Sequence, residues 1–596
     1  MTFAAEKVKA GRKPFVIVEL VLDSCAEAYG VSPCTASQAA AESCYNTRKT
    51  CQDPANYNKT TKTMKLCSMV SNFPLGEGFI PCLKGTPAFS STRLEPDMGL
   101  GARGTVTINA ADQAWPDRDC DPYWASRIYD WRTQGTFWGK FRARHPYYIG
   151  RKMIVKTGYL TSTGGYDAAN FRSRTYFLEK ISQTGTDGTV SIKGKDVFGL
   201  VDEKAAVIPD YSAGQLTAAL TAGGSSFSVT AGEGVNYPAS NGEVRIGDEV
   251  IAYTTRTTDT FSGLTRGARN TTATAHDQDD IVQRCYVMNN LNVVAFIDEL
   301  LETYGGIDGD LYIPYDAGLT TPTGTNNEWD DEQDDWLSSY DLTGIITEPT
   351  PIKHILREVG ENCNLGTWWD PVEAKIKLKA NVPPRATETV TTLTDNHNIV
   401  KGSIRVKDLP ERRISRVYIS YGEINPTEDR KASNFQFLEG DIDSDSEGAD
   451  KYDKVALKHI YARFFDSTNT GEAASVSGRL RSRFNEIPQE IEFMLDAKDE
   501  DLEVGDLVSL EHDEIPGPDG AALGTQLQII EAKEVKAGHL YKYVGLSSRY
   551  TSRYARIGPN TLGDYGAASA ADKATYSWVS NNTGIFSDGD PAYSII

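Results

Sequence analysis

Cysteine is the residue type whose distribution in this chain points most clearly to chemistry. Thiolates bind soft metal centres, and thiols pair into disulfides where the compartment is oxidising. Five of the nine cysteines fall in one window near the amino terminus: Cys25, Cys34, Cys44, Cys51 and Cys67. The other four are spread over the rest of the chain: Cys82, Cys120, Cys285 and Cys363. The crowding predicts a local ligand set or a disulfide-linked segment.

Three chemical explanations compete for this window, beside a fourth in which the thiols are buried and unreactive. Disulfides are usual in secreted chains, but the first residues offer only a short apolar run, Phe15 to Leu22, with no small-residue cleavage site after it. Structural zinc sites usually carry paired CxxC knuckles, and this window has none. The spacing C-x8-C-x9-C-x6-C-x15-C suits loops around a larger iron–sulfur cube, and equally suits cysteines that merely become neighbours in the fold. Spacing alone leaves these alternatives open.

The rest of the sequence predicts a mainly β chain with α+β parts. Apolar and polar residues alternate in GTVTINA, RKMIVKTGYL and GTVSIKGKDV, and again in RISRVYISYG and QEIEFML, which is typical of half-buried strands. Apolar residues at helical spacing in NLNVVAFIDELLETYG and PIKHILREVGENC predict two helices, followed by a strand pair around Asp370 and Pro371. The stretch GEAASVSGRLRSRFN predicts a further helix with a basic face.

The predicted organisation follows these changes of texture. We expect a cysteine-rich segment at 1–85 and an α+β part at 287–399. Two barrel-like β-domains are expected, at 86–208 and 400–555. A small inserted β-domain is expected at 209–286, with strands in GEVRIGDEVIAYT and a turn from Gly263 to Gly267, and an extended arm at 556–596.

Two further segments carry local predictions. FWGKFRARHPYYIGR alternates Phe141, Ala143 and His145 with Arg142 and Arg144, which favours a strand with one wet face that packs between subunits. DKVALKHIYARFFD is interpreted as a helix.

Composition and charge exclude several functional classes. The net charge is −21, so we expect no nucleic-acid binding by neutralisation of phosphates. No run of 18 apolar residues is present, so no membrane span is expected. The sequence has no GxSxG, HExxH, P-loop or GxGxxG motif in a suitable context, and its seven histidines are scattered, so we expect no enzyme.

Several of these segments together resemble one known family. The runs DSCAEAYGVSPC, SCYNTRKTCQDPANY and TMKLCS, followed by DPYWASR and GTFWGKFRARHPYYIGR, resemble the tail tip or baseplate hub proteins of long-tailed (siphophage, lambda-like) bacteriophages and gene transfer agents. The C-x6-C-x15-C pattern of Cys44, Cys51 and Cys67, with a cysteine upstream, is similar to the cluster-binding pattern of the lambda-like tail tip protein. The resemblance implies a [4Fe–4S] cluster held by Cys34, Cys44, Cys51 and Cys67. Cys25 is a fifth cysteine that matches hub relatives but not the lambda-like pattern.

The resemblance also implies a role. Such a protein is a structural virion component, a homotrimeric hub at the distal tip of a non-contractile tail, assembled in the cytoplasm of the host bacterium. Its implied partners are the distal tail protein ring, the tape-measure protein, and tail fibre or receptor-binding proteins, and DNA passes through it during ejection. Two alternatives from other classes are an iron–sulfur redox protein or enzyme, and a secreted adhesin with disulfides.

Overall fold

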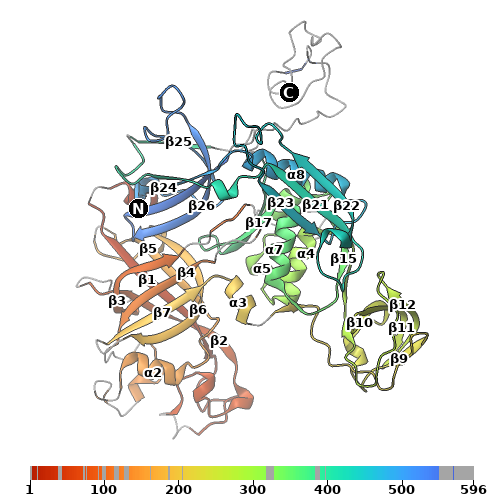
Figure 1. Ribbon diagram of the computed structural model, residues 1–596. Coiled ribbons are helices and arrows are strands. Elements are labelled where there is room, and N and C mark those ends of the chain that lie inside the picture. Colours follow the sequence, from red (N-terminus) through yellow and green to blue (C-terminus); the bar gives the residue numbers. More distant parts are fainter. Residues whose placement is uncertain are drawn as a thin grey trace.

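The computed structural model describes residues 3–9, 11–37, 43–70, 74, 77–90, 93–96, 99, 103–112, 120–126, 130, 133, 135–161, 163–184, 188–203, 206–316, 328–382, 390–395, 397–548, 565 and 568–569. Within them the chain is mainly β-structure in several sheets with fewer helices, which confirms the predicted fold class. Figure 1 shows an N-terminal barrel, a C-terminal sheet above it, a helical part beside them and a small β-domain set apart at the lower right.

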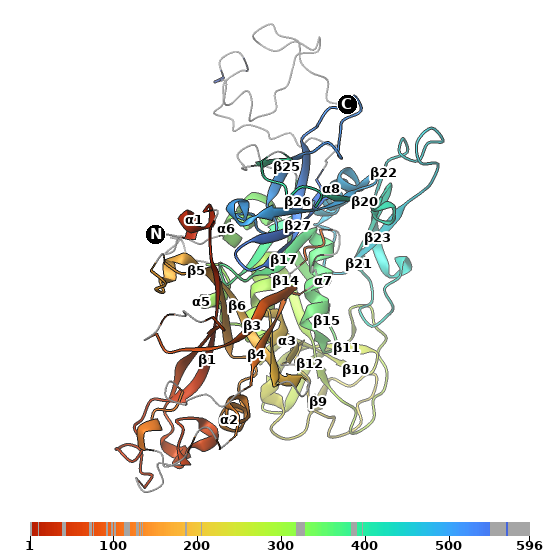
Figure 2. The same ribbon diagram turned by 90° about the vertical axis from the view of Figure 1, so that its left-hand side faces the viewer.

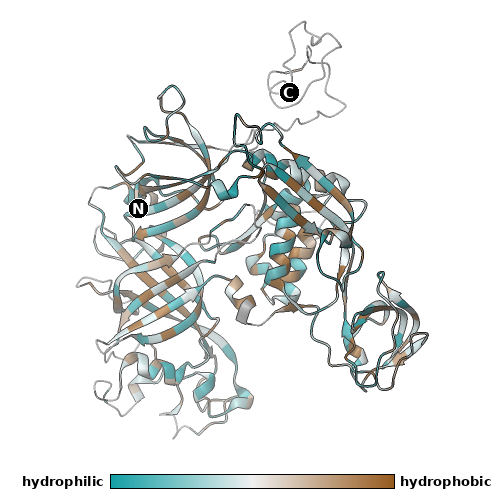
Figure 3. Cartoon of the chain, viewed as in Figure 1, coloured by the Kyte–Doolittle hydropathy of each residue, from teal (hydrophilic) through white to brown (hydrophobic). Residues whose placement is uncertain are grey.

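The N-terminal strands close into a barrel. Its order is β1 (Pro14–Cys25), β2 (Lys59–Ser68), β3 (Phe79–Ser90), β4 (Thr105–Ala111), β7 (Thr189–Lys195), β6 (Phe171–Thr184) and β5 (Lys152–Tyr159), which returns to β1. Alternate residues of β1 enter the barrel core: Val16, Val18, Leu20 and Leu22. Figure 3 shows apolar residues alternating with polar ones along these strands. The segment 1–85 is therefore no separate unit, because β1 to β3 are staves of the barrel.

Helix α2 (Phe137–Arg144) lies at one end of the barrel and corrects the strand prediction for this segment. Thr136 caps its first turn by accepting a hydrogen bond from the Gly139 N–H. Phe137, Trp138 and Phe141 are buried in the barrel core, at the spacing of one helical face. The alternation of arginines that suggested a strand is thus subordinate to the helical spacing of the aromatic residues.

The small β-domain has its own core. Its sheet has the order β13 (Gln283–Arg284), β10 (Ser240–Ile246), β11 (Glu249–Thr257), β12 (Thr260–Ala268) and β9 (Ser226–Ser228). The predicted turn from Gly263 to Gly267 is wrong, since both glycines lie inside β12, at positive φ. The chain enters and leaves this domain at one place, where the backbone N–H of Arg284 donates to the Ser212 hydroxyl at 2.9 Å.

The central part packs helices and short sheets around the largest core of the molecule. Its helices are α3 (Phe198–Glu203), α4 (Val293–Glu299) continued by η7 (Leu300–Tyr304), α5 (Gly309–Tyr312), α6 (Glu328–Glu332) continued by η8 (Gln333–Leu337), α7 (Ile352–Cys363) and α8 (Thr470–Phe484). Its sheets pair β8 (Val207–Ile208) with β16 (Thr350–Pro351), β14 (Tyr286–Asn292) with β15 (Asp341–Ile346), and β17 (Leu365–Asp370) with β18 (Lys375–Ala380). A three-stranded sheet has the order β22 (Phe435–Ile442), β21 (Arg416–Glu423) and β23 (Leu457–Ala462).

The helix predictions for this part have mixed outcomes. Helices α4 and α7, the β17–β18 pair and helix α8 are confirmed. The helix expected in DKVALKHIYARFFD is wrong, because residues Leu457–Ala462 form β23, which pairs in parallel with β21. The basic face predicted for α8 is also wrong in part: Arg479 and Arg483 are buried.

The C-terminal part forms a six-stranded sheet with β19 and β20 at its ends. Its order is β19 (Thr391–Thr394), β25 (Leu507–Glu511), β26 (Thr525–Lys536), β27 (Leu540–Ser547), β24 (Gln489–Asp496) and β20 (Arg405–Asp408). The arm expected at 556–596 lies outside the described residues, apart from residues 565 and 568–569. Across the part of the chain that the structure describes, no helix is both long and apolar enough to span a bilayer.

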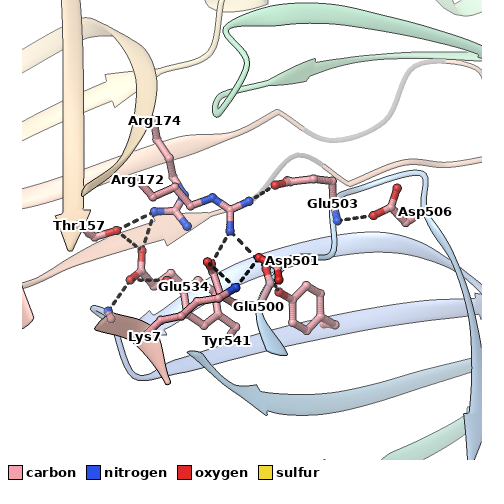
Figure 4. Close-up of polar contacts among 12 residues, drawn as sticks. Lys7, Thr157, Arg172, Arg174, Glu500, Asp501, Glu503, Asp506, Glu534 and Tyr541 are labelled. Carbon is pink, nitrogen blue, oxygen red and sulfur yellow. Dashed lines mark hydrogen bonds and ion pairs between the residues drawn. The ribbon is translucent and has the colours of Figure 1, made fainter. Parts of the chain in front are cut away.

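A buried ion pair joins the barrel to the C-terminal sheet. Arg174 on β6 donates to the carboxylate of Glu534 on β26 at 2.6 Å, and both side chains are almost fully buried. Glu534 also accepts from the Thr157 hydroxyl at 3.0 Å, the Tyr541 hydroxyl at 3.0 Å and the Gly538 N–H at 2.6 Å (Figure 4). These bonds satisfy the buried carboxylate and fix the sheet on the barrel.

A second group of ions extends this joint to the amino terminus. Arg172 on β6 contacts the carboxylates of both Glu500 and Glu503. Lys7 of α1 (Phe3–Lys7) lies 3.8 Å from Glu500 and 2.5 Å from Asp501 (Figure 4). The first helix, the barrel and the C-terminal sheet thus share one network of charges.

Candidate functional site

The cysteine window forms the long connection between β1 and β2. Cys25 is the last residue of β1, and Cys34, Cys44 and Cys51 follow in residues 26–58, before β2 begins at Lys59. All four cysteines line one cavity. This connection lies beside α2 at the end of the barrel far from the C-terminal sheet (Figures 1 and 2). The fold thus brings together three of the four predicted ligands, with Cys25 as the fourth thiol.

Cys67 corrects the predicted ligand set, because it lies elsewhere in the barrel wall. In the antiparallel pairing of β1 with β2, Cys67 is opposite Ile17 whereas Cys25 is opposite Lys59. The eight residues of β1 between these positions span about 26 Å at the usual rise of a strand. Cys67 instead packs against Phe15 and its apolar neighbours, where burial raises the pKa of its thiol to about 12.

Hydrogen bonds within the protein hold the cysteine loops together. The Cys25 N–H donates to the Asn46 carbonyl at 2.7 Å, which ties the end of β1 to the loop that carries Cys44. Asp53 accepts from the N–H and the hydroxyl of Thr35 at 2.7 and 2.8 Å, which ties the loop after Cys51 to the loop after Cys34. The Thr35 N–H and further hydrogen bonds lower the pKa of Asp53. Two independent ties therefore set the positions of the four thiols.

Short 3₁₀ turns and cationic side chains complete the loop. Turn η2 (Arg48–Thr50) is capped by Thr47, and η3 (Pro54–Asn56) follows Cys51. The Arg144 guanidinium of α2 lies 3.9 Å from the ring centre of Tyr45, the residue after Cys44. Nearby, burial together with Arg144 and Lys62 lowers the pKa of His145 to about 4. The Cys44 loop is thus packed against a positively charged end of α2.

The residues around the cavity fit a group bound by four thiolates. Burial raises the pKa of the Cys44 thiol, so an ordinary thiolate is disfavoured there unless a cation stabilises it. The hydroxyls of Tyr29 and Tyr57 are buried beside the cysteines and have no hydrogen-bond partner among the described residues. A [4Fe–4S] cube takes one thiolate on each of four separated irons, so its ligands surround a cavity. Over the described residues, no three histidine, cysteine, aspartate or glutamate side chains converge on a point that one metal ion would occupy.

The other cysteines are core residues. All nine cysteines are free thiols in this structure. Burial raises the pKa of the thiols of Cys82, Cys285 and Cys363, each of which lies in an apolar core. Their surroundings contain no arrangement that distinguishes them from ordinary small apolar side chains.

Comparison with known proteins gives little beyond this geometry. The sequence matches no protein-family model and no curated protein. Among solved structures, the chain is similar to a 43 kDa tail protein of prophage MuSo2 from Shewanella oneidensis, at 12% identity over 78% of this chain and 96% of that one, with a TM-score of 0.35. A tail protein from Neisseria meningitidis gives 10% identity over 77% and 91% of the two chains, with a TM-score of 0.38.

A chain from the virion of a native gene transfer agent particle gives 9% identity over 66% and 82%, with a TM-score of 0.28. All of these TM-scores lie below 0.5, so the likenesses carry no argument about this chain.

Proposed function

We propose that this chain is a structural subunit of the tail tip of a long-tailed phage or gene transfer agent, and that it binds a [4Fe–4S] cluster in its β1–β2 connection. The proposed ligands are Cys25, Cys34, Cys44 and Cys51. The observation that carries the proposal is that these four thiols line one cavity in a connection already fixed by hydrogen bonds. The sequence resemblance supplies the tail-tip role.

The cluster would act as a crosslink. Residues 26–58 contain no strand and only short 3₁₀ turns, so little else orders this long connection. Four bonds to one inorganic core would restrict the unfolded loop, with an entropic advantage that grows with the length of chain closed. Such a crosslink persists in a reducing cytoplasm, where a disulfide does not.

The proposed partners follow from the tail-tip role. We infer a homotrimeric hub that contacts the distal tail protein ring, the tape-measure protein, and tail fibre or receptor-binding proteins, and that takes no part in catalysis. The buried ion pairs between β6 and β26 support this role, because they give the subunit a rigid joint between its barrel and its C-terminal sheet. A net charge of −21 suits a channel through which DNA must pass without binding.

The cluster is tested by measuring iron and acid-labile sulfide per chain in protein purified without oxygen. We expect about four of each, as a [4Fe–4S] centre requires. Changing any one proposed ligand to alanine, for example Cys51→Ala, should abolish most of both. Cys67→Ala is the matched control, since it removes a thiol from the same window but far from the cavity, and it should keep the iron. Zinc in place of iron, or loss of iron in Cys67→Ala, would contradict the assignment.

The tail-tip role is tested on particles. An antibody against this chain, with gold detection in electron microscopy, should label the distal end of the tail. Labelling elsewhere on the particle, or no labelling of particles that contain every other tail protein, would refute the role. This result is independent of the iron measurement, so the two halves of the proposal can fail separately.

A further inference from the structure

Two tyrosine hydroxyls beside the cysteines lack any hydrogen-bond partner among the described residues. They belong to Tyr29, whose side chain is 7% exposed, and to Tyr57, which is half-buried but whose hydroxyl oxygen is fully covered. A covered hydroxyl without a partner is costly and is normally avoided in a folded protein. Two of them at one site indicate that an acceptor belongs there.

The two hydroxyls divide the four cysteines between them. Tyr29 lines the cavity itself. Burial first, and then the thiolate charges of Cys44 and Cys34, raise the pKa of Tyr29. Burial first, and then the charges of Cys25, Asp23 and Cys51, raise the pKa of Tyr57. Each pair of cysteines thus has one tyrosine within electrostatic reach.

Both tyrosines are held in place by contacts that leave the hydroxyl unused. The Tyr29 N–H donates to the Tyr123 hydroxyl at 2.7 Å, and the two rings meet edge to face with centres 6.1 Å apart. The Tyr57 ring lies under the Arg48 guanidinium, 5.3 Å from its centre. The rings are therefore positioned by the protein, whereas the hydroxyls remain available to a bound group.

We propose that Tyr29 and Tyr57 donate O–H···S hydrogen bonds to the sulfur atoms of the centre that the four cysteines hold. The inference rests on the proposed cluster and names two positioning residues for it. Four thiolates give such a centre a net negative charge, which donors at the sulfurs stabilise. Since the more reduced centre carries more charge, these bonds favour reduction and slow the loss of iron.

The test compares Tyr29→Phe, Tyr57→Phe and the double variant with the wild type, and with Tyr147→Phe as a control at a tyrosine that is 59% exposed. Each protein is loaded anaerobically, and the rate of iron release to a ferrous chelator and the midpoint potential are measured. We expect release to become about 10- to 100-fold faster, as for other partners of metal ligands, and the potential to become more negative. In the cluster-free protein the Phe variants should melt at the same temperature as the wild type or higher, because each removes an unpartnered hydroxyl.

The outcomes separate this inference from the proposed function. If the wild type holds iron and the Phe variants match it in release rate and potential, the tyrosines are not donors and the inference is overturned. A lower melting temperature of the cluster-free variants would overturn it too, since the hydroxyls would then have partners within the protein. A wild type that binds no iron would overturn the cluster itself, and this inference with it.

Discussion

Removing Arg174 should open the joint between the barrel and the C-terminal sheet. The Arg174–Glu534 pair is 2.6 Å long, and its two side chains are only 9% and 0% exposed. Arg174→Met keeps most of the side-chain volume but leaves the Glu534 carboxylate buried without its cation. Breaking a buried pair in this way costs about 3–5 kcal/mol.

The assay is hydrogen exchange of the backbone amides of β6 and β26, which reports local opening in a chain too large for a single unfolding step. At 1.36 kcal/mol per factor of ten, the expected cost corresponds to exchange about 150- to 5,000-fold faster. The matched control is Lys193→Met, which removes the cation of the Lys193–Glu179 pair, where the side chains are 44% and 34% exposed. An exposed pair contributes about 0–1 kcal/mol, so exchange should change less than tenfold.

A double variant sharpens the test. Arg174→Met with Glu534→Leu removes both charges, so no ion is left buried alone, and it should exchange more slowly than Arg174→Met. The reasoning is refuted if Arg174→Met behaves like Lys193→Met, or if the double variant is destabilised by the sum of its two single changes.

Three further predictions concern other parts of the fold. Gly360→Ala, which would stabilise an ordinary helix by about 1 kcal/mol, should lower the melting temperature, because the added Cβ would lie 2.7 Å from the Gly99 Cα. Burial raises the pKa of Glu423 from 4.5 to about 7, so stability should fall as the pH rises through that window, and Glu423→Gln should remove this dependence in thermal melts. Against the effect of burial, hydrogen bonds from Arg266 and other donors lower the pKa of Glu249 from 4.5 to about 2, so the small β-domain should lose stability as the pH falls from 4.5 towards 2, which amide exchange in β11 would show.

The elements that the sequence predicted well are those with a strong local period. Helix α7 begins and ends within the predicted segment, because Ile352, Ile355, Leu356 and Val359 form one apolar stripe. The strands of the barrel were likewise visible in their alternation. Two segments failed because a second pattern competed with the first. In α2 the arginines alternate while the aromatics keep helical spacing, and in β23 pairing with β21 overrides a helix-like stretch.

The candidate site was predicted in part. The window and three of its thiols were identified from crowding, but spacing along the chain does not record where a strand carries a residue. Cys67 follows the alternating run TMKLCS, in which Met64 and Leu66 are buried in the barrel core, and this period was the available signal that it belongs to a strand. Cys25 ends the apolar strand that starts the loop, so its place beside the cavity depends on the pairing of β1 with β2. The tyrosine hydroxyls had no signal in the sequence, because their lack of a partner is a property of the packed loop.

The point where the chain enters and leaves the small β-domain works as a socket. The Ser212 hydroxyl accepts from the Arg284 N–H at 2.9 Å, and the Asp210 carbonyl accepts from the Gln283 side chain at 2.9 Å, so the two ends of the domain lie side by side. Everything between them can be exchanged for another module whose own ends meet, while β8 and β14 on either side keep their partners. The scaffold can thus acquire new surface chemistry through a single recombination event, without rebuilding its core.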